Sequence, residues 1–530
     1  MTSTFRDRCP VTASYLGDGM IRALDEDSSG PSLRDALRLA VRCGQAPFFT
    51  PDLCTLELAV ASVDRASADG PPNGERPVIN PALQLCALES RGCIDLLRGN
   101  PARQQAVPGQ EMVLVWKMDG MVRVEVAAPE DLAALKIVAE GLDPDAAAHE
   151  GNAEPGLVRM LLQRAVAKGL ILAPPSRIRR GVTESPGGSP CPESAQTAEV
   201  FTLQWHLTQS CDLSCRHCYD RSARPETPLA RAMEVIADFR DFCRQRNVRG
   251  QISLSGGNPL MYPHFLEVYR RAADEGFALA ILGNPAPRER IAEIAAIARP
   301  VYYQVSLEGL PEHNDAIRGR GHFERVMGFL DVLRDLDIQG QIMLTLTRDN
   351  MHQVLPLAEL LEGRVWGLAF NRLSPVGRGA ALALPEPSAF QDFLEEYCRA
   401  AERLSVLSFK DNMLNAHLAR SGRPTFGGCT GFGCGAAFNF MALLPDGEVH
   451  ACRKFPSQIG DISRSGLGEI YDGPQAARYR KRSRACLDCS IATVCGGCPA
   501  VTSGLGLDIA RDRDPFCPGP ILPTSTKDPA

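Results

Sequence analysis

The chain has 530 residues, a length that suggests about three domains at roughly 150 residues each. Its hydrophobic fraction of 44% and charged fraction of 23% are those of a globular protein, which excludes wholesale disorder and fibrous repeats. The formal net charge of -6 argues against a chain-wide polyphosphate-binding surface.

Nineteen cysteines are the unusual feature of the composition. The first ten residues lack the basic start and apolar run of a signal peptide, and no window offers about 18 consecutive apolar residues. We therefore expect a cytoplasmic protein without a membrane span, in which cysteines serve more often as metal ligands or redox groups than as disulfides. Eight of the nineteen lie between Cys429 and Cys517, and this clustering favours metal binding.

The first 175 residues are expected to form a mainly helical region over 1–107 and a small winged-helix unit over 108–175. The wing is indicated by two runs within 112–127 that flank Asp119-Gly120, a dipeptide favoured in tight two-residue turns. Amphipathic patterns predict that two helices follow, over 129–141 and 154–169.

A unit of this shape could bind either a peptide or DNA. It resembles the small domains that bind leader peptides during peptide maturation, in which the peptide would add a strand to the exposed edge of the wing. A DNA reader should concentrate Lys and Arg on its second helix. The predicted second helix carries Arg159, Arg164 and Lys168 against Glu154, a mild balance that favours a peptide.

The composition and hydrophobic pattern change twice along the rest of the chain. Residues 176–198 are rich in Ser, Pro and Gly and are predicted to be a linker. Over 199–424, β-like runs alternate with helical segments, which predicts an α/β fold with a parallel sheet closed partway into a TIM-like (β/α)6 barrel. The six runs are 201–208, 251–255, 278–282, 301–307, 341–347 and 366–372. Over 425–530 Gly and Cys replace regular periodicity, and we expect this segment to depend on metal for its fold.

The first predicted strand of the barrel runs into a loop that carries Cys211, Cys215 and Cys218 at C-x3-C-x2-C spacing. Loops that follow the strands form the functional face of α/β barrels. Three thiolates can hold three irons of a [4Fe–4S] cluster and leave the fourth iron open to a ligand. A zinc loop is the alternative interpretation of three cysteines alone.

The cysteine motif, followed directly by Tyr219, resembles that of the radical S-adenosylmethionine (radical SAM) enzymes. The resemblance implies that SAM chelates the open iron and is cleaved by one electron to a 5′-deoxyadenosyl radical. Residues at the ends of later strands add to the resemblance. After the second predicted strand, the GGNP segment is similar to the family's GGEP segment, which contacts the SAM amino group. Polar residues after the fourth strand would lie near the SAM ribose, and an arginine of the sixth strand would approach the SAM carboxylate. The implied SAM-binding residues are Tyr219, Gly256, Gly257, Asn258, Pro259, Ser306, Glu308 and Arg372.

The eight C-terminal cysteines divide into two sets of four, and each set could ligate a four-iron cluster. A zinc ribbon is the alternative, but ribbon knuckles usually lie about 15 to 20 residues apart, whereas only five residues separate Cys489 and Cys495. The pattern resembles the SPASM extension of radical SAM enzymes that modify ribosomally made peptides and proteins. That resemblance implies a nearer auxiliary cluster on Cys429, Cys434, Cys452 and Cys498, and an outer one on Cys486, Cys489, Cys495 and Cys517, although Cys495 and Cys498 could exchange roles.

Together these features predict a radical SAM enzyme that abstracts a substrate hydrogen and modifies a ribosomally synthesised peptide. The segments GGNPL, 281–285 and 452–457 are similar to those of thio(seleno)oxazole or selenobiotic-type maturases, which implies a target cysteine or selenocysteine. The expected cofactors are SAM and three [4Fe–4S] clusters. The expected partners are a precursor peptide bound through its leader and a flavodoxin or ferredoxin, with no nucleic acid and no membrane.

Two other functions remain open. The first is maturation of a folded protein, such as a quinohaem amine dehydrogenase subunit or a sulfatase. Sulfatase maturases usually carry an aspartate base directly after the cysteine at the position of Cys452. Arg453 stands there in this chain, which makes a sulfatase a less favoured substrate. The second is an iron–sulfur transcriptional sensor that would use the winged helix on DNA.

Overall fold

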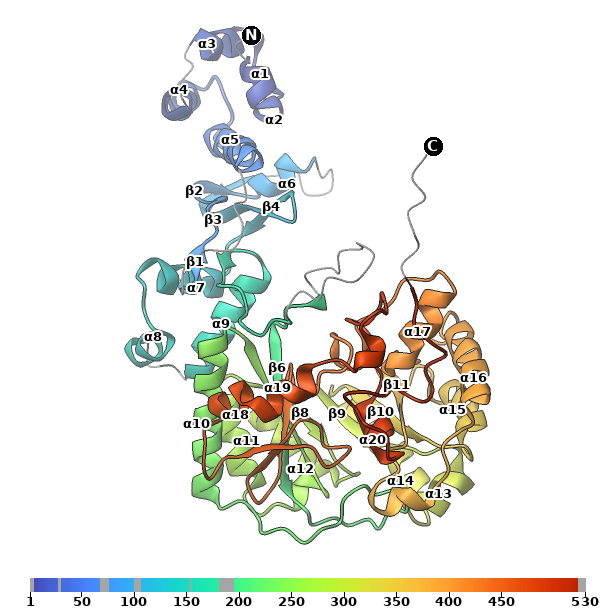
Figure 1. Cartoon of the computed structure of the whole chain (residues 1–530). Helices are drawn as coiled ribbons and strands as arrows, with labels where there is room; N and C mark the ends of the chain where they lie inside the picture. Colours follow the sequence, from blue (N-terminus) through green and yellow to red (C-terminus); the bar gives the residue numbers. More distant parts are fainter. Residues whose placement is uncertain are drawn as a thin grey trace, which may run out of the picture. The chain divides into compact units, whose positions relative to one another are not determined.

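The computed structural model describes residues 4–26, 30–66, 76–99, 106–151, 153, 155–180 and 195–522. The chain divides into two compact units, Met1–Pro175 and Ser176–Ala530 (Figure 1). Most of the predicted linker, residues 181–194, lies outside the described residues, and so does Cys191. No helix within the described ranges is long and apolar enough to cross a membrane.

The N-terminal part of the first unit is helical, as expected. Its helices are α1 (Phe5–Arg8), α2 (Pro10–Ala13), α3 (Asp18–Glu26), α4 (Gly30–Arg42) and α5 (Thr50–Arg65). The buried Glu57 of α5 accepts hydrogen bonds from the backbone N–H groups of Val11 and Thr12, at 2.7 and 2.8 Å. This carboxylate satisfies amides at the start of α2 that have no partner within that helix.

The predicted hairpin is present, and it belongs to a sheet with the order β2-β3-β4. Asp119 and Gly120 form its turn with φ of 51° and 76°, the left-handed backbone that such a turn requires. The strands are β2 (Leu83–Arg91), β3 (Val107–Met118) and β4 (Met121–Val126). The sheet therefore starts before residue 108, the predicted boundary, because β2 pairs along the length of β3.

Short elements surround this sheet. The two predicted helices are present as α7 (Pro129–Ala139) and α9 (Pro155–Ala167), and α9 is followed by Gly169 at φ 74°. The other elements are β1 (Val78–Ile79), α6 (Cys93–Leu97), α8 (Pro144–Glu150) and β5 (Ile171–Leu172), with β1 antiparallel to β5. Trp116, Ala134, Ala165 and Leu170 pack into one buried cluster, which fixes the helices on the wing.

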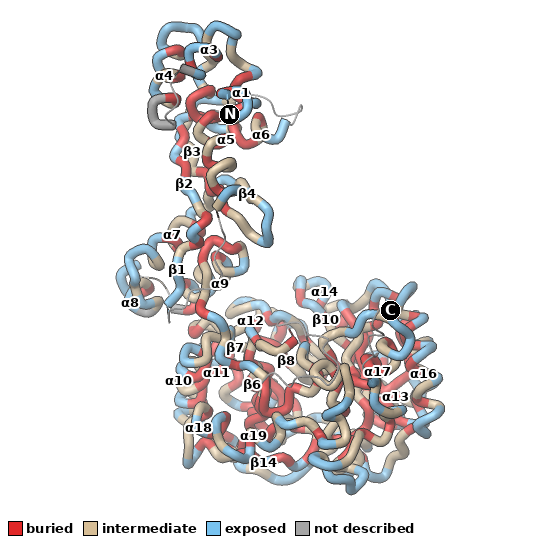
Figure 2. The backbone as a smooth tube through the Cα atoms, turned by 45° about the horizontal axis from the view of Figure 1, so that its top comes forward, coloured by how far each residue is buried: buried red, intermediate tan, exposed pale blue. Residues whose placement is uncertain are grey.

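The six predicted strands of the second unit form a parallel sheet, which confirms the α/β fold. They are β6 (Val200–Thr208), β7 (Arg249–Gly256), β8 (Ala278–Leu282), β9 (Tyr302–Ser306), β10 (Gly340–Leu346) and β11 (Gly367–Arg372). The crossover helices are α10 (Leu229–Arg246), α11 (Phe265–Asp274), α12 (Arg288–Ile297), α13 (Pro311–Arg318), α14 (His322–Asp335), α15 (Val354–Leu361) and α16 (Pro387–Ala400). Figure 2 shows how strongly β6 is buried.

The C-terminal segment extends the same sheet. β12 (Phe440–Leu443) pairs in parallel with β6, and β13 (Glu448–His450) and β14 (Gln458–Asp461) continue it in antiparallel fashion. The predicted turn at Asp446-Gly447 joins β12 to β13, which leads directly to Cys452. Helices that the sequence did not predict are α17 (Asn412–Arg420), which precedes this segment, and α18 (Leu467–Asp472), α19 (Pro474–Arg480) and α20 (Pro499–Gly504) within it.

Candidate functional site

A cavity of about 1040 Å³ lies inside the second unit. Its wall is built from alternate residues of the parallel strands, because residues two apart in a strand share a face. These are Thr202, Gln204 and His206 of β6, Gln251, Ser253 and Ser255 of β7, Gln304 and Ser306 of β9, and Met343 and Thr345 of β10. Nine of these ten side chains are polar, so the strands offer hydrogen-bonding groups to a polar ligand.

The three cysteines of the C-x3-C-x2-C loop all line this cavity. Cys211 Sγ accepts a hydrogen bond from Asn284 Nδ2 at 3.6 Å, and Cys215 Sγ accepts one from Arg318 Nη1 at 3.8 Å. Burial raises the pKa of both thiols, so they need such donors or a metal to ionise. The donor set fits an iron–sulfur cluster with one open iron.

The glycine pair after β7 is pressed against the cysteine loop. A Cβ on Gly256 would lie 2.2 Å from the Thr208 carbonyl oxygen, and one on Gly257 would lie 2.2 Å from that of Ser210. The Gly257 N–H donates to Thr208 O at 2.8 Å. Only glycine fits this approach, and both glycines line the cavity.

Asn258 and Pro259 do not line the cavity, in contrast to the sequence prediction. Asn258 is buried, and its Nδ2 donates to Asp212 Oδ1 at 2.9 Å. Asn284 Nδ2 donates to the same oxygen at 2.7 Å. The Asn258 amide therefore holds the cysteine loop at Asp212, the residue after Cys211, from outside the cavity.

Of the two SAM residues predicted at the end of β9, one lines the cavity and the other does not. Ser306 lines the cavity, whereas Glu308 is buried behind it and binds Arg318, with 2.6 Å between Oε1 and Nη2. Burial would raise the pKa of Glu308, but His217 and Arg318 outweigh it and hold the pKa below its ordinary value. Arg318 itself lines the cavity. Arg318 was not among the predicted SAM residues, although it is the charged side chain after β9 that reaches the cavity.

Arg372 takes a role that the sequence did not predict. Although it borders the cavity, its guanidinium is fully buried and bound to two carboxylates. Nε donates to Asp411 at 2.9 Å, and the two Nη atoms donate to Asp514 at 2.8 and 2.7 Å. Each guanidinium nitrogen therefore already donates to a carboxylate, and Arg372 joins the barrel to the C-terminal segment; its contact with the SAM carboxylate stays a prediction.

Two cysteines of the C-terminal segment, Cys429 and Cys452, line the same cavity as the first three. Burial raises the pKa of Cys452 to about 12, and the nearby thiols of Cys434 and Cys498 contribute to the shift. The thiols of Cys429 and Cys498 act on Cys434 in the same direction. The cysteines that act on one another here are those that the resemblance assigns to the nearer cluster, and that assignment stays a prediction.

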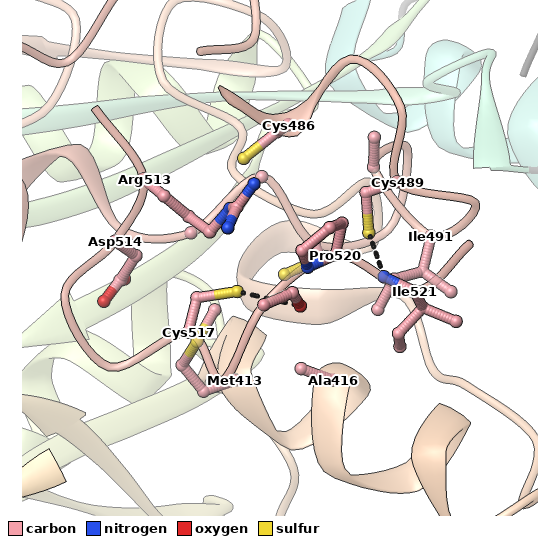
Figure 3. Close-up of a pocket in the computed structure, with 15 residues that line it drawn as sticks. Met413, Ala416, Cys486, Cys489, Ile491, Arg513, Asp514, Cys517, Pro520 and Ile521 are labelled. Atoms are coloured by element: carbon pink, nitrogen blue, oxygen red, sulfur yellow. Dashed lines mark hydrogen bonds between the residues drawn. The ribbon is translucent and has the colours of Figure 1, made fainter. Parts of the chain in front are cut away.

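The other four C-terminal cysteines, Cys486, Cys489, Cys495 and Cys517, line a separate small pocket (Figure 3). Cys489 Sγ accepts a hydrogen bond from the Ile521 N–H at 3.5 Å, and Cys517 Sγ lies 3.4 Å from the Gly519 carbonyl oxygen. Cys495 lines this pocket and Cys498 does not. Among the described side chains, no three of His, Cys, Asp or Glu converge as the ligands of a single ion would.

Arg453, which stands where a sulfatase maturase has its base, is buried and forms an ion pair with Asp220. Its guanidinium lies 5.0 Å from the centre of the Tyr219 ring, and its Nε donates to His206 Nδ1 at 3.4 Å. All four side chains line the cavity. His206 Nε2 and His217 Nδ1 are buried without a hydrogen-bond partner within the described part of the chain. Such atoms indicate that a polar ligand belongs in the cavity.

Comparison with known proteins agrees with this geometry. Residues 205–361 match the radical SAM superfamily, and residues 434–498 match the SPASM iron–sulfur cluster-binding domain. The mycofactocin maturase MftC of Mycobacterium ulcerans is 30% identical over 334 residues, which cover 59% of this chain and 87% of that protein. The chain therefore belongs to the radical SAM enzymes that carry a SPASM domain.

The chain is also similar to a second curated protein and to a solved structure. The AdoMet-dependent heme synthase of Methanosarcina barkeri is 25% identical over 351 residues, which cover 61% of this chain and 97% of that protein. The crystal structure of Streptococcus suis SuiB bound to its precursor peptide SuiA superposes with a TM-score of 0.51 at 15% identity. That match covers 77% of this chain and 96% of SuiB, and it shows a shared fold.

Proposed function

We propose that this enzyme uses radical SAM chemistry to modify a ribosomally synthesised peptide. The observation that carries the proposal is a single cavity lined by Cys211, Cys215 and Cys218 of the loop after β6 and by Cys429 and Cys452 of the C-terminal segment. A substrate held there would reach both a SAM site and an auxiliary cluster. The relatives MftC, a maturase, and SuiB, seen with a precursor peptide, support a peptide substrate.

The three loop cysteines would hold the cluster that binds SAM. When bound, this cluster supplies one electron for the reductive cleavage of SAM to a 5′-deoxyadenosyl radical, which removes a hydrogen atom from the substrate. The chain's own residues would orient SAM: Gly256 and Gly257 let the end of β7 pack closely against the cysteine loop at the cavity wall, and Ser306 and Arg318 offer polar groups to the ligand. Tyr219 and the strand side chains enclose the reaction and exclude water.

The two C-terminal sets of four cysteines would hold two auxiliary clusters, for a total of three per chain. Cys429, Cys434, Cys452 and Cys498 form the nearer set, and Cys486, Cys489, Cys495 and Cys517 form the outer set. Since the nearer set borders the cavity, it can accept an electron from the substrate radical or hold a substrate thiolate. The electron for SAM cleavage would come from a flavodoxin or ferredoxin in the cytoplasm.

The first unit would bind the leader of the precursor. β2 and β4 are the outer strands of its sheet, and β4 exposes Met121 (56%) and Val126 (53%) beside its polar residues. An extended peptide can pair with such an edge strand and place its apolar side chains on these residues. We keep residues 108–175, joined by β2, as the proposed recognition unit.

Co-purification tests the substrate class. Tagged enzyme prepared without oxygen should recover a short precursor peptide encoded beside its gene, and the peptide should change mass when SAM and dithionite are added. Recovery of a folded enzyme subunit would instead support a protein maturase. Binding to its own promoter, with no 5′-deoxyadenosine formed, would support a transcriptional sensor. A cysteine or selenocysteine target would be seen as a mass change at that residue.

A further inference from the structure

Arg482 lies beside a backbone hydrogen bond that joins the two sets of C-terminal cysteines. The Cys434 N–H, from the nearer set, donates to the carbonyl oxygen of Cys495, from the outer set, at 3.2 Å. Arg482 Nη2 donates to Phe432 O at 3.2 Å and to Thr493 O at 2.7 Å. Its guanidinium therefore joins the two backbone segments that carry these cysteines.

Glycines make room for this guanidinium on both sides. A Cβ on Gly433 would lie 2.9 Å from Arg482 Nη2, and one on Gly496 would lie 2.2 Å from Nη1. Gly433 directly precedes Cys434 and Gly496 directly follows Cys495, and both glycines have positive φ, of 67° and 69°. The backbone of each cysteine segment is thus shaped around the arginine.

The charge of Arg482 has no carboxylate partner within 4 Å in the described parts of the chain. A second arginine, Arg180, donates to Phe432 O at 3.2 Å and to Cys434 O at 2.5 Å, and its Nε is buried without a partner among the described residues. Burial lowers the pKa of both arginines, and the thiols of nearby cysteines oppose the shift. Both guanidinium groups are partly buried, and ligand thiolates would provide the negative charge that such cations need nearby.

From this arrangement we infer that Arg482 is a charge-balancing residue shared by the two auxiliary clusters, which raises the reduction potential of both. One-electron reduction adds a negative charge to a cluster, and a fixed cation in a poorly solvated site stabilises that reduced form. Arg180 also donates to Arg480 O at 3.3 Å, but among the described residues the only ligand cysteine that it contacts is Cys434, so it acts on the nearer cluster only. The inference rests on the two auxiliary clusters of the proposed function and not on the identity of the substrate.

The test is a redox titration followed by electron paramagnetic resonance. Variants are made in a background in which Cys211, Cys215 and Cys218 are alanine, so that only the auxiliary clusters contribute. Iron and sulfide analysis of that background comes first, and about eight irons per chain are expected. A count of about four would contradict the two clusters themselves, which separates that failure from a failure of the role of Arg482.

Arg482→Gln should lower both midpoint potentials by at least the equivalent of a tenfold change in the reduction equilibrium, about 59 mV for a one-electron couple. Arg180→Gln should lower only one of them, and Arg482→Lys should restore most of the shift. Arg484→Gln is the matched control, because Arg484 is an exposed arginine of the same segment. Loss of iron from R482Q with retention in R482K would also support a role of the charge. Unchanged potentials in R482Q, or loss of iron from both variants, would overturn it.

Discussion

Arg372 and Asp514 face each other in a two-pronged ion pair, with 2.8 Å between Nη1 and Oδ1 and 2.7 Å between Nη2 and Oδ2. Arg372 ends the last strand of the barrel, and Asp514 lies between the last two cysteines of the C-terminal segment. Asp514 Oδ2 also accepts a hydrogen bond from the Cys498 N–H at 2.8 Å. One carboxylate therefore connects the barrel to the nearer set of cysteines.

Breaking this pair should destabilise the second unit. Asp514→Asn leaves part of a buried positive charge without its counterion, and such a change typically costs about 3–5 kcal/mol. Asp508→Asn is the control, because Asp508 pairs with Arg511 at the surface, where ion pairs contribute about 0–1 kcal/mol. The free energy of unfolding, measured without oxygen, should separate the two variants. Equal stability of D514N and D508N would show that the pair is not a structural link.

The loop cysteines should be necessary for SAM cleavage. Replacing Cys211, Cys215 and Cys218 by alanine should abolish 5′-deoxyadenosine formation and reduce the iron content from about twelve to about eight per chain. Cys43→Ala is the control, because Cys43 is exposed and lies in the other unit. Chromatography of the reaction products measures the cleavage. Cleavage that persists in the triple variant would refute the role of the loop.

Glu308 should act on SAM binding through Arg318. Glu308→Gln removes the charge that holds Arg318 beside Cys215, and the loss of a charge-assisted hydrogen bond should weaken SAM binding about tenfold. Glu312→Gln, an exposed change on α13, should have no effect. Equilibrium binding of SAM to the reconstituted enzyme measures both. Equal SAM affinity in E308Q and E312Q would show that Glu308 does not support SAM binding.

His206 should make folding sensitive to mild acid. Burial, and then the Arg453 charge, hold the pKa of His206 well below its ordinary value, so the folded protein keeps it neutral. The unfolded chain binds a proton below about pH 6.5, so stability falls as the pH drops through that value towards the folded pKa. Between pH 7.5 and 5.5 this one group should cost about 1.4 kcal/mol.

His206→Gln should therefore reduce the loss of stability between these two pH values by about that amount. His264→Gln is the control, because the His264 side chain is 44% exposed. Unfolding free energies at both pH values provide the comparison. A pH dependence in H206Q that matches the unmodified protein would argue against a neutral buried imidazole.

The edge of the wing should contribute to peptide binding. Val126→Lys places a charge where an apolar side chain of the leader is proposed to lie, and we expect binding to weaken about tenfold. Leu39→Lys, on the exposed face of α4 in the same unit, is the matched control. Fluorescence anisotropy of a labelled precursor measures the affinity. If V126K and L39K bind equally well, the leader binds elsewhere.

Local patterns predicted the features that depend on local sequence. The six parallel strands alternate with helices at regular spacing, and the Asp119-Gly120 dipeptide accounts for the hairpin turn. The cysteine loop that begins at Cys211 was also predicted, because its C-x3-C-x2-C motif comes directly after a strand pattern.

Long-range relationships could not be predicted from those patterns. The strand β2 was missed because its exposed Leu85 obscures the alternation, and the pairing of β12 with β6 joins segments more than two hundred residues apart. The partners of Arg372 lie 39 and 142 residues away, so a strand-end arginine was assigned to SAM when tertiary contacts had engaged it. Arg318 was not predicted either, because only the folded chain shows that it is buried beside Glu308 and lines the cavity.

Hydrogen transfer from the peptide is the most direct test of the proposed chemistry. The precursor encoded beside the gene would be made with deuterium at carbon and incubated without oxygen with the reconstituted enzyme, SAM and dithionite. Mass spectrometry should find deuterium in 5′-deoxyadenosine and a mass change in the peptide. Formation of 5′-deoxyadenosine without deuterium, beside an unchanged peptide, would contradict the proposed function.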